Sequence, residues 1–476
     1  MFSAVILLLM IIHLGQLNSL MFSDILDSSQ NYITQLSDKD DCGKPLHLTP
    51  LIESGKISEA QNISRVTDLE HNIKSHAGFL TVNKRFKTSL FFWFFKAKSN
   101  DWENSPLLLW LQGGPGMTSL YGLFMENGPF EIKRESSDEF SLLNRKYAWT
   151  NEYNVVYIDN PAGVGYSHTS SEKGYATNQK QVANNLYKAL VQLFKLFPSI
   201  QSNKFFLTGE SYAGKYIPAL GYKIHSANKK SKFRINLTGL FVGNAFFSPG
   251  DQLIYGDYLK MIGLLDENQQ HIFNTYQADI KNLIDKKDWL NATFKFSELF
   301  FRSIYGYPTL FNNYTGLSQH YNYISDFPAE SAENYKNFMA FVTKASTRKM
   351  IHVGNTPWGE YNTVAWHLRA DIMKPVSAWL EVLLDHYDVL FYNGQLDVIC
   401  AYPGTVNAFK QLQWSGAQEY RQADSKKWYI ENKLAGYYKK TGRFIDIMVR
   451  NTGHMVPKDN PLWAYTLLNQ FVSKSL

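Results

Sequence analysis

One stretch decides the fold: Lys204-Phe205-Phe206-Leu207-Thr208-Gly209-Glu210-Ser211-Tyr212-Ala213-Gly214-Lys215-Tyr216-Ile217-Pro218. An apolar β-like run ends at Gly209, Ser211 follows two residues later, and the small residues Ala213 and Gly214 open an amphipathic segment. A strand, a sharp turn and a helix in this order are typical of a nucleophile elbow, in which strained backbone lifts the serine above the sheet. The fifth position is Ala213 rather than glycine, and read alone the pattern also fits an ordinary loop serine. Ser211 is therefore a candidate nucleophile that needs partners elsewhere in the chain.

Other apolar runs continue this rhythm on both sides of the stretch. Strands are predicted at 79–82, 89–95, 107–111, 155–159, 240–244, 388–394 and 444–449, with helices at 178–196 and 376–384. Strands that alternate with helices at this spacing indicate a mostly parallel sheet flanked by helices on both faces. From residue 249 to 345 the pattern changes to amphipathic helices, which predicts an inserted helical cap. The predicted organisation is an α/β core over 20–248 and 346–476, with the cap over 249–345 between its two parts.

The amino-terminal segment, residues 1–19, contains the apolar run Val5–Ile12 followed by small and polar residues. It is typical of a cleaved signal peptide, although it lacks the usual positive charge at its start. No later segment is long and apolar enough for a membrane helix, so we expect a secretory-pathway protein with no membrane partner. Four N-x-[S/T] sequons agree with that location and are candidate glycosylation sites: Asn62, Asn236, Asn291 and Asn313.

Composition excludes several classes of function. The chain has 476 residues, 45% of them hydrophobic, and a net charge of +6 that is spread along its length, so nucleic acid is not an expected partner. The densest basic run, Lys229–Arg234, fits a solvated connector better than an anion-binding patch. Only Cys42 and Cys400 could form a disulfide, and two buried or free thiols are favoured over a bond. The histidines show no paired ligand spacing, so we expect no metal and no cofactor.

Two late strands end in the residue types that a serine nucleophile requires. Asp397 follows the strand at 388–394 and supplies a carboxylate, and His454 follows the strand at 444–449 and supplies an imidazole. The chain order Ser211, Asp397, His454 is that of the α/β-hydrolase fold, and it differs from the order in the chymotrypsin and subtilisin folds. We therefore predict that these three residues form a catalytic triad.

Four blocks, 110–116 (WLQGGPG), 209–214 (GESYAG), 393–397 (NGQLD) and 453–457 (GHMVP), are highly specific in combination. Through them the chain after its signal resembles the serine carboxypeptidases, and among these the vitellogenic carboxypeptidase-like group. The resemblance implies an α/β-hydrolase fold with an inserted cap. It also implies an enzyme that releases C-terminal residues from peptides or proteins through an acyl-enzyme at acidic pH. Such a protein is secreted or lysosomal and is a candidate homodimer.

The resemblance implies a role for each residue of the triad. Ser211 attacks the scissile carbonyl, His454 takes its proton and returns it to the leaving amine, and Asp397 orients the imidazole. The oxyanion is met by the backbone N–H groups of Tyr212 and of Gly114 in the glycine-rich turn. Loss of one such donor typically lowers turnover by about 10²–10³.

A carboxylate next to the nucleophile would repel the C-terminal carboxylate of a peptide by about 4 kcal/mol, at about 4 Å and an effective dielectric near 20. In the family this glutamate, a second glutamate and an amide recognise the free C-terminus, and the matching positions are Glu210, Glu126 and Gln112, with a backbone donor at Gly113. A proton shared by the two carboxyl groups raises the pKa of the pair and makes Glu210 a donor in acid. Taken alone, Glu126 also fits an ordinary surface glutamate in a salt bridge.

The chain departs from the family pattern in three places. Gln112 stands where many members have asparagine, but members of the vitellogenic-like group also have glutamine there. Met117 stands where many members have a cysteine, which leaves Cys400 without its usual partner, and the cap lacks the family's disulfides. Met455 and the cap are expected to shape side-chain preference. Acyl transfer on the same scaffold, or a protective or scaffolding protein with an incidental triad, are the alternative functions, and Ser211→Ala discriminates between catalysis and a non-catalytic role.

Overall fold

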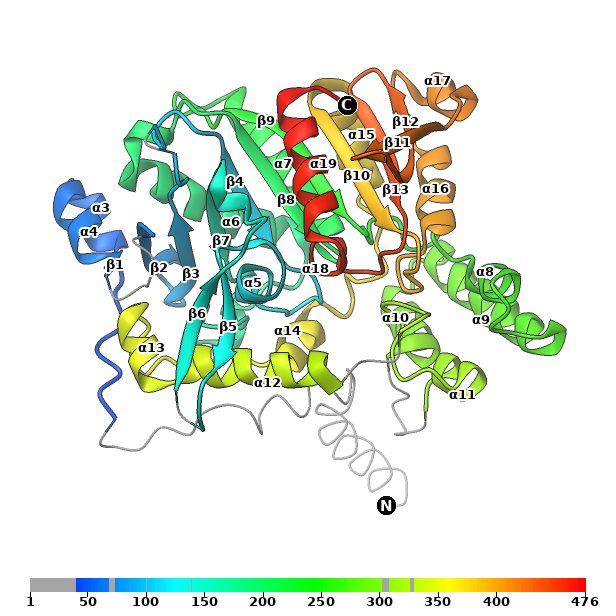
Figure 1. The fold of residues 1–476 in the computed structure, drawn as a ribbon, viewed down its shortest axis with the longest axis horizontal. Helices are drawn as coiled ribbons and strands as arrows, with labels where there is room; N and C mark the ends of the chain where they lie inside the picture. The colour runs from blue at the N-terminus through cyan, green and yellow to red at the C-terminus, as the bar shows by residue number, and fades with distance from the viewer. Residues whose placement is uncertain (1–39, 68–72, 100, 138, 302–307, 326–328) are drawn as a thin grey trace, which may run out of the picture.

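The computed structural model describes residues 40–67, 73–99, 101–137, 139–301, 308–325 and 329–476. The predicted signal peptide lies outside these ranges. An eleven-stranded sheet forms the centre, in the order β1-β2-β3-β7-β4-β8-β9-β10-β13-β12-β11 (Figure 1). In that order the strands are Arg65–Val66, Ser75–Asn83, Thr88–Phe95, Asn154–Ile158, Leu107–Leu111, Phe205–Glu210, Leu237–Gly243, Asp388–Gly394, Phe444–Val449, Lys433–Thr441 and Lys426–Ile430. The six strands from β7 to β13 are parallel neighbours, which confirms the predicted parallel core, and the strands at both edges are antiparallel.

Alternating side chains of the central strands build two separate cores. In β4, Leu107, Leu109 and Leu111 pack into one apolar cluster, whereas Leu108 and Trp110 pack into the other. The first cluster includes side chains of α6 (Gln179–Leu196), α7 (Ala213–Asn228) and α15 (Ser377–His386), and the second includes those of α5 (Ser119–Gly122) and α19 (Pro461–Ser473). Because both faces are covered, these strands read as continuous apolar runs rather than alternating ones.

Helices dominate the segment that joins β9 to β10. Its first five are α8 (Tyr255–Met261), α9 (Glu267–Asp285), α10 (Trp289–Phe300), α11 (Leu310–Thr315) and α12 (Ala329–Thr343), followed by α13 (Ala345–Met350) and α14 (Tyr361–Leu368). In Figure 1, α10, α11, α12 and α14 lie along the lower side of the molecule, below the sheet. The predicted cap boundaries at 249 and 345 stay a prediction.

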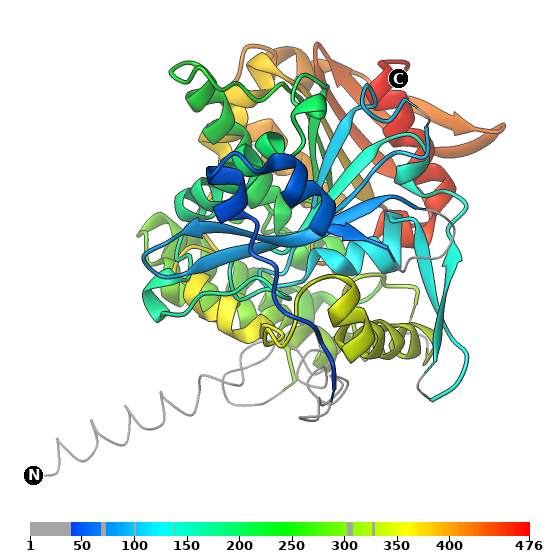
Figure 2. The same ribbon diagram turned by 90° about the vertical axis from the view of Figure 1, so that its left-hand side faces the viewer.

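A hairpin of β5 (Phe130–Arg134) and β6 (Phe140–Asn144) packs against α12, and Figure 2 shows it standing away from the main sheet. The same view places α3 (Thr49–Glu53) and α4 (Ile57–Ile63) at the β1–β3 edge of the sheet. The remaining helices, α16 (Tyr402–Gln411), α17 (Ala417–Gln422) and α18 (Val456–Asp459), follow β10 and β13. The two hairpins, β5–β6 and β11–β12, were not expected from the sequence.

The structure also places the cysteines and the sequons. Cys42 and Cys400 are both buried free thiols. The four sequon asparagines are exposed: Asn62 on α4, Asn236 before β9, Asn291 on α10 and Asn313 on α11. In the part of the chain that the structure describes, no helix has the length and apolar character that crossing a membrane requires.

Candidate active site

The turn between β8 and α7 carries Ser211 in a left-handed conformation, with φ of 61°. Such backbone costs about 1–3 kcal/mol and persists only where the surroundings fix it. Three backbone hydrogen bonds do so here: Ser211 N–H donates to Gly243 O at 2.9 Å, and Ser211 O accepts from Gly214 N–H at 2.9 Å and from Phe246 N–H at 3.0 Å. A Cβ atom on Gly113 would lie 2.6 Å from Ser211 Cβ, so only glycine allows the turn after β4 to approach this closely.

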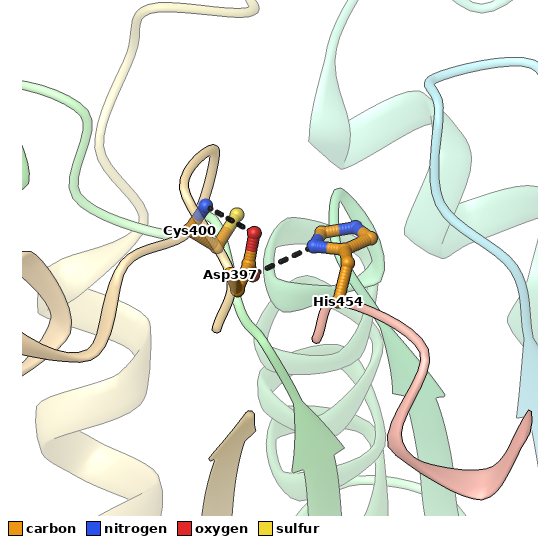
Figure 3. A group of neighbouring side chains, drawn as sticks. All are labelled: Asp397, Cys400 and His454. Atoms are coloured by element: carbon orange, nitrogen blue, oxygen red, sulfur yellow. Dashed lines mark hydrogen bonds and ion pairs between the residues drawn. The ribbon is translucent and has the colours of Figure 1, made fainter. Parts of the chain in front are cut away.

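The loops after β10 and β13 bring Asp397 and His454 together. The His454 Nδ1 atom lies 2.8 Å from Asp397 Oδ2, and both side chains are buried (Figure 3). A carboxylate at Nδ1 fixes the tautomer that leaves Nε2 free to accept a proton. The backbone N–H of Cys400 donates to the other oxygen, Asp397 Oδ1, at 3.3 Å.

Asn244, at the end of β9, completes the setting of the carboxylate. Its Nδ2 donates to Asp397 Oδ2 at 2.7 Å, and its Oδ1 accepts from Gly394 N–H at 3.2 Å. The residue is fully buried and has a φ of 42°. The sequence pattern places Asn244 in the predicted strand 240–244 and indicates no role for it. The available signal was its place at the carboxyl end of a parallel strand, where polar side chains of neighbouring strands converge.

Ser211 and His454 border one cavity of about 210 Å³, which is also lined by Gln112, Gly113, Gly114, Glu210 and Met455. A second, mainly apolar cavity of about 40 Å³ adjoins Ser211 and is lined by Phe246, Phe296, Phe301, Ile372 and Ile399. Within the described residues no hydrogen bond joins Ser211 Oγ to His454. Such bonds are often long before substrate binds and tighten in the complex. Because Ser211 lines both cavities, it lies where they meet.

The two predicted oxyanion donors lie next to the elbow. Tyr212 immediately precedes α7, so its N–H has no acceptor within the helix. A Cβ atom on Gly113 would lie 2.7 Å from Tyr212 N, which places the glycine-rich turn against that N–H. Gly114 has a φ of 114°, a conformation that L side chains rarely adopt. Gly114 and Tyr212 line the same small cavity beside Ser211.

Gln112, Glu126 and Glu210 form a buried cluster beside this turn. Gln112 Nε2 donates to Glu126 Oε1 at 3.1 Å and to Glu210 Oε1 at 2.8 Å. Trp110 Nε1 donates to Gln112 Oε1 at 2.8 Å, so the amide is oriented with its donors toward both carboxyl groups. Glu126 lies on η4 (Leu123–Asn127), a widened helical turn, and is 1% exposed, which excludes the alternative of an exposed surface glutamate.

Burial dominates the protonation of the two carboxyl groups. Loss of solvent raises the pKa of Glu126 to about 7, although hydrogen bonds from Glu210 and Gln112 partly oppose the rise. Burial, the charge of Glu126 and a hydrogen bond with Glu126 raise the pKa of Glu210 well above its ordinary value. Two adjacent buried carboxyl groups cannot both be charged at low energetic cost, so they retain a proton between them.

The predicted specificity residue Met455 follows His454 and lines the larger cavity. Its Sδ atom accepts a hydrogen bond from the Tyr121 hydroxyl at 3.2 Å. Tyr121 lines the same cavity, so the pair forms one wall of it.

Asp397, Cys400 and His454 are also a candidate metal-binding group, because their potential ligand atoms lie within 4.8 Å of one another (Figure 3). Burial and the nearby charge of Asp397 raise the pKa of the Cys400 thiol well above its ordinary value. A thiol ligates a metal as the thiolate, and both Asp397 oxygens already accept hydrogen bonds. The donor set therefore fits a metal poorly.

Comparison with known proteins places these features in a family. A family model described as serine carboxypeptidase (Peptidase S10) matches residues 66–474. The chain is 46% identical over 435 residues to venom serine carboxypeptidase from Apis mellifera, a match that covers 91% of this chain and 92% of the relative. It is 40% identical over 440 residues to the probable serine carboxypeptidase CPVL from Homo sapiens, with coverage of 91% and 90%.

A solved structure supports the fold independently. The prohormone-processing carboxypeptidase Kex1(Δ)p from Saccharomyces cerevisiae superposes with a TM-score of 0.73 at 24% identity, covering 87% of this chain and 96% of that one. At this identity the likeness bears on the fold alone, and it confirms the predicted α/β-hydrolase fold.

Proposed function

This chain belongs to the serine carboxypeptidase family, and we propose that it releases single residues from peptide C-termini through an acyl-enzyme, at acidic pH. Membership makes it a serine-type hydrolase. The acyl-enzyme, the acidic range and the residue roles are our proposal. The observation that carries it is that Ser211 and His454 line one cavity together with Gln112 and Glu210, which are hydrogen-bonded to each other beside the buried Glu126.

The proposed reaction begins with His454 taking the Ser211 proton as the serine attacks the scissile carbonyl. Asp397 holds the imidazole through the 2.8 Å contact and stabilises its charged form. The N–H groups of Gly114 and Tyr212 stabilise the oxyanion. His454 then protonates the leaving amine, which departs as the released amino acid, and water attacks the acyl-enzyme by the same route.

Selection of a free C-terminus is assigned to Gln112, Gly113, Glu126 and Glu210. In acid the glutamates are protonated, so the cluster offers hydrogen-bond donors instead of charge to the substrate carboxylate. As the pH rises through the raised pKa of Glu126, near 7, a negative charge appears and recognition is lost. Recognition of the substrate carboxylate is therefore strongest in acid, and the raised pKa of Glu126 is sufficient to explain an acidic working range.

The compartment is part of the proposal. A secretory or lysosomal location agrees with the predicted signal peptide at 1–19 and with an acidic optimum. The four exposed sequon asparagines are compatible with glycosylation, and a homodimer stays a prediction. Loss of mass after endoglycosidase treatment of the secreted protein tests the glycosylation.

The experiment that tests the function is release of the C-terminal residue from an N-acyl-Phe-Leu dipeptide between about pH 4 and 8, for wild type and Ser211→Ala. We expect activity that is highest in acid and is reduced by roughly 10⁴–10⁶ in the variant. If folded wild type releases no residue at any pH, the proposal is wrong. Transfer of the acyl group to an acceptor other than water then becomes the hypothesis to test. Full activity in Ser211→Ala would show that Ser211 is not the nucleophile.

A further inference from the structure

A short segment between α11 and α12 lies against both loops that carry the acid–base pair. We call residues 319–323 the strap. His320 O accepts hydrogen bonds from Val398 N–H at 3.1 Å and from Ile399 N–H at 3.3 Å, directly after Asp397. On the other side of Asp397, Tyr323 N–H donates to Leu396 O at 3.1 Å. The strap therefore pairs with the chain on both sides of the carboxylate.

The same segment holds the histidine loop. Tyr321 O accepts from His454 N–H at 2.7 Å, and the two rings lie 5.2 Å apart with 40° between their planes. A Cβ atom on Gly453 would come within 2.3 Å of Tyr321 O, so the close approach of the two segments requires glycine there. One residue of the strap thus contacts both the backbone and the imidazole of His454.

Gln319 gives the strap its shape. This side chain is 5% exposed, and its Oε1 accepts from Tyr321 N–H at 2.6 Å and from Asn322 N–H at 3.0 Å. Its Nε2 donates to Asn322 O at 2.6 Å and to Ser325 O. A single amide therefore satisfies backbone groups of three residues, which a turn without regular secondary structure cannot satisfy by itself.

We propose that the strap is a positioning element of the reaction, in which Gln319 fixes the strap and the His320 and Tyr321 carbonyls fix the loops of Asp397 and His454. This inference rests on the proposed function, because it assumes that Asp397 and His454 act as the acid–base pair. Gln319 lines the same cavity as His454, but among the described residues it makes no hydrogen bond to the side chain of Asp397 or His454, so it acts on them through the strap. Displacement of a catalytic group by about 1 Å can lower the rate by about 10²-fold. Loss of the Gln319 amide is expected to lower kcat more than it changes KM.

Two variants test the inference, with kcat and KM measured on a blocked dipeptide from about pH 4 to 8. Gln319→Met keeps the volume and removes every hydrogen bond, and we expect kcat to fall about 10–100-fold with KM within about twofold of wild type. Gln319→Glu keeps the acceptor but, when ionised, places an anion against two carbonyl oxygens. A neutral carboxyl group can both donate and accept. The activity of Gln319→Glu should therefore approach wild type in acid and fall toward that of Gln319→Met as the pH rises.

Asn154 supplies a matched control. This fully buried amide also holds three backbone groups, because it accepts from Ala97 N–H at 3.1 Å and donates to Trp102 O at 2.7 Å and Ser105 O at 2.9 Å. It begins β7, at the opposite end of the parallel strands from the site. Asn154→Asp should lower the unfolding midpoint and leave the pH profile of kcat unchanged.

Three outcomes decide the question. A pH-dependent loss of kcat in Gln319→Glu that Asn154→Asp does not share supports positioning by the strap. If both Gln319 variants fold and keep kcat within about twofold of wild type while Ser211→Ala is inactive, the strap inference is wrong and the proposed function stands. If Ser211→Ala keeps its activity, the proposed function fails first, whatever the Gln319 variants do.

Discussion

The carboxyl pair supplies the sharpest prediction about specificity. We consider the enzyme in which Glu126→Gln and Glu210→Gln are combined, so that the cluster keeps its shape and can no longer ionise. In wild type the pKa of Glu126 is raised to about 7, a shift that corresponds to roughly 3–4 kcal/mol. A charge that forms about 4 Å from the substrate carboxylate weakens binding by about 4 kcal/mol at an effective dielectric near 20. This is about a 10³-fold loss of affinity, as an upper value.

The assay compares two substrates, a blocked dipeptide with a free C-terminus and the same dipeptide with a C-terminal amide. The ratio of their kcat/KM values cancels every effect of pH that is common to both substrates. In wild type we expect this ratio to be high in acid and to fall as the pH rises from about 6 to 8, because a raised pKa means that the neutral form is lost only there. In the double variant the ratio should be constant over that range.

The result that would refute the reasoning is a double variant whose ratio falls with pH as steeply as that of wild type. The carboxylate would then be recognised elsewhere, and the glutamates would be a buried structural pair. A ratio near one at every pH in wild type would contradict exopeptidase recognition altogether. Circular dichroism of the double variant at pH 5 and 8 is the control for folding.

Two further changes test groups that lie deeper in the structure. Asn244→Asp replaces the amide that donates to Asp397 with a carboxylate that cannot donate when it is ionised. We expect kcat to fall about 10–100-fold near pH 7, as for the loss of a hydrogen bond to a charged group. Unchanged turnover at pH 7 would show that Asp397 does not need this donor. Asp446→Asn concerns stability: burial raises the pKa of Asp446 from 3.8 to about 6, so the folded state holds a proton that the unfolded state has released, and stability is lost as the pH rises between these values. We compare the change in the free energy of unfolding that Asp446→Asn causes at pH 7 with the change that it causes at pH 4, both measured by urea unfolding. The change at pH 7 should be more stabilising by up to ~3 kcal/mol. An equal change at both pH values would contradict the linkage between stability and the raised pKa of Asp446.

The sequence is most informative where strands are buried on both faces. The predicted bounds of β4, β10 and β13 coincide with those observed, and in β4 the continuous apolar run 107–111 itself marks both ends. The edge hairpin β11–β12 was missed for the opposite reason. Its first strand, Lys426–Ile430, begins with two exposed lysines, and such a pattern resembles a polar loop.

The triad candidates could be predicted because each follows a strand and the three occur in the chain order of the fold, and Ser211 also has small residues nearby. Asn244 has a strand end but no further signature, and its role depends on β9 lying beside β10. The buried state of Glu126 depends on the packing of a widened turn, which no local pattern encodes. Gln319 is harder still to identify, because its partners are backbone atoms of the strap and of Ser325, and its proposed role depends on which loops the strap contacts.

The contacts of the strap change how variation in the helical segment should be interpreted. α10 and α11 supply walls of the substrate cavities, so substitutions there are expected to alter KM and side-chain preference. The strap follows α11 within the same segment, and its backbone is bonded to the loops of Asp397 and His454. A rearrangement of these helices would therefore move the acid–base pair as well as the cavity walls. Exchange of this segment between relatives should therefore change kcat together with the preference for substrate side chains. Substitutions that change this preference alone should affect only residues that line a cavity and make no hydrogen bond to the strap.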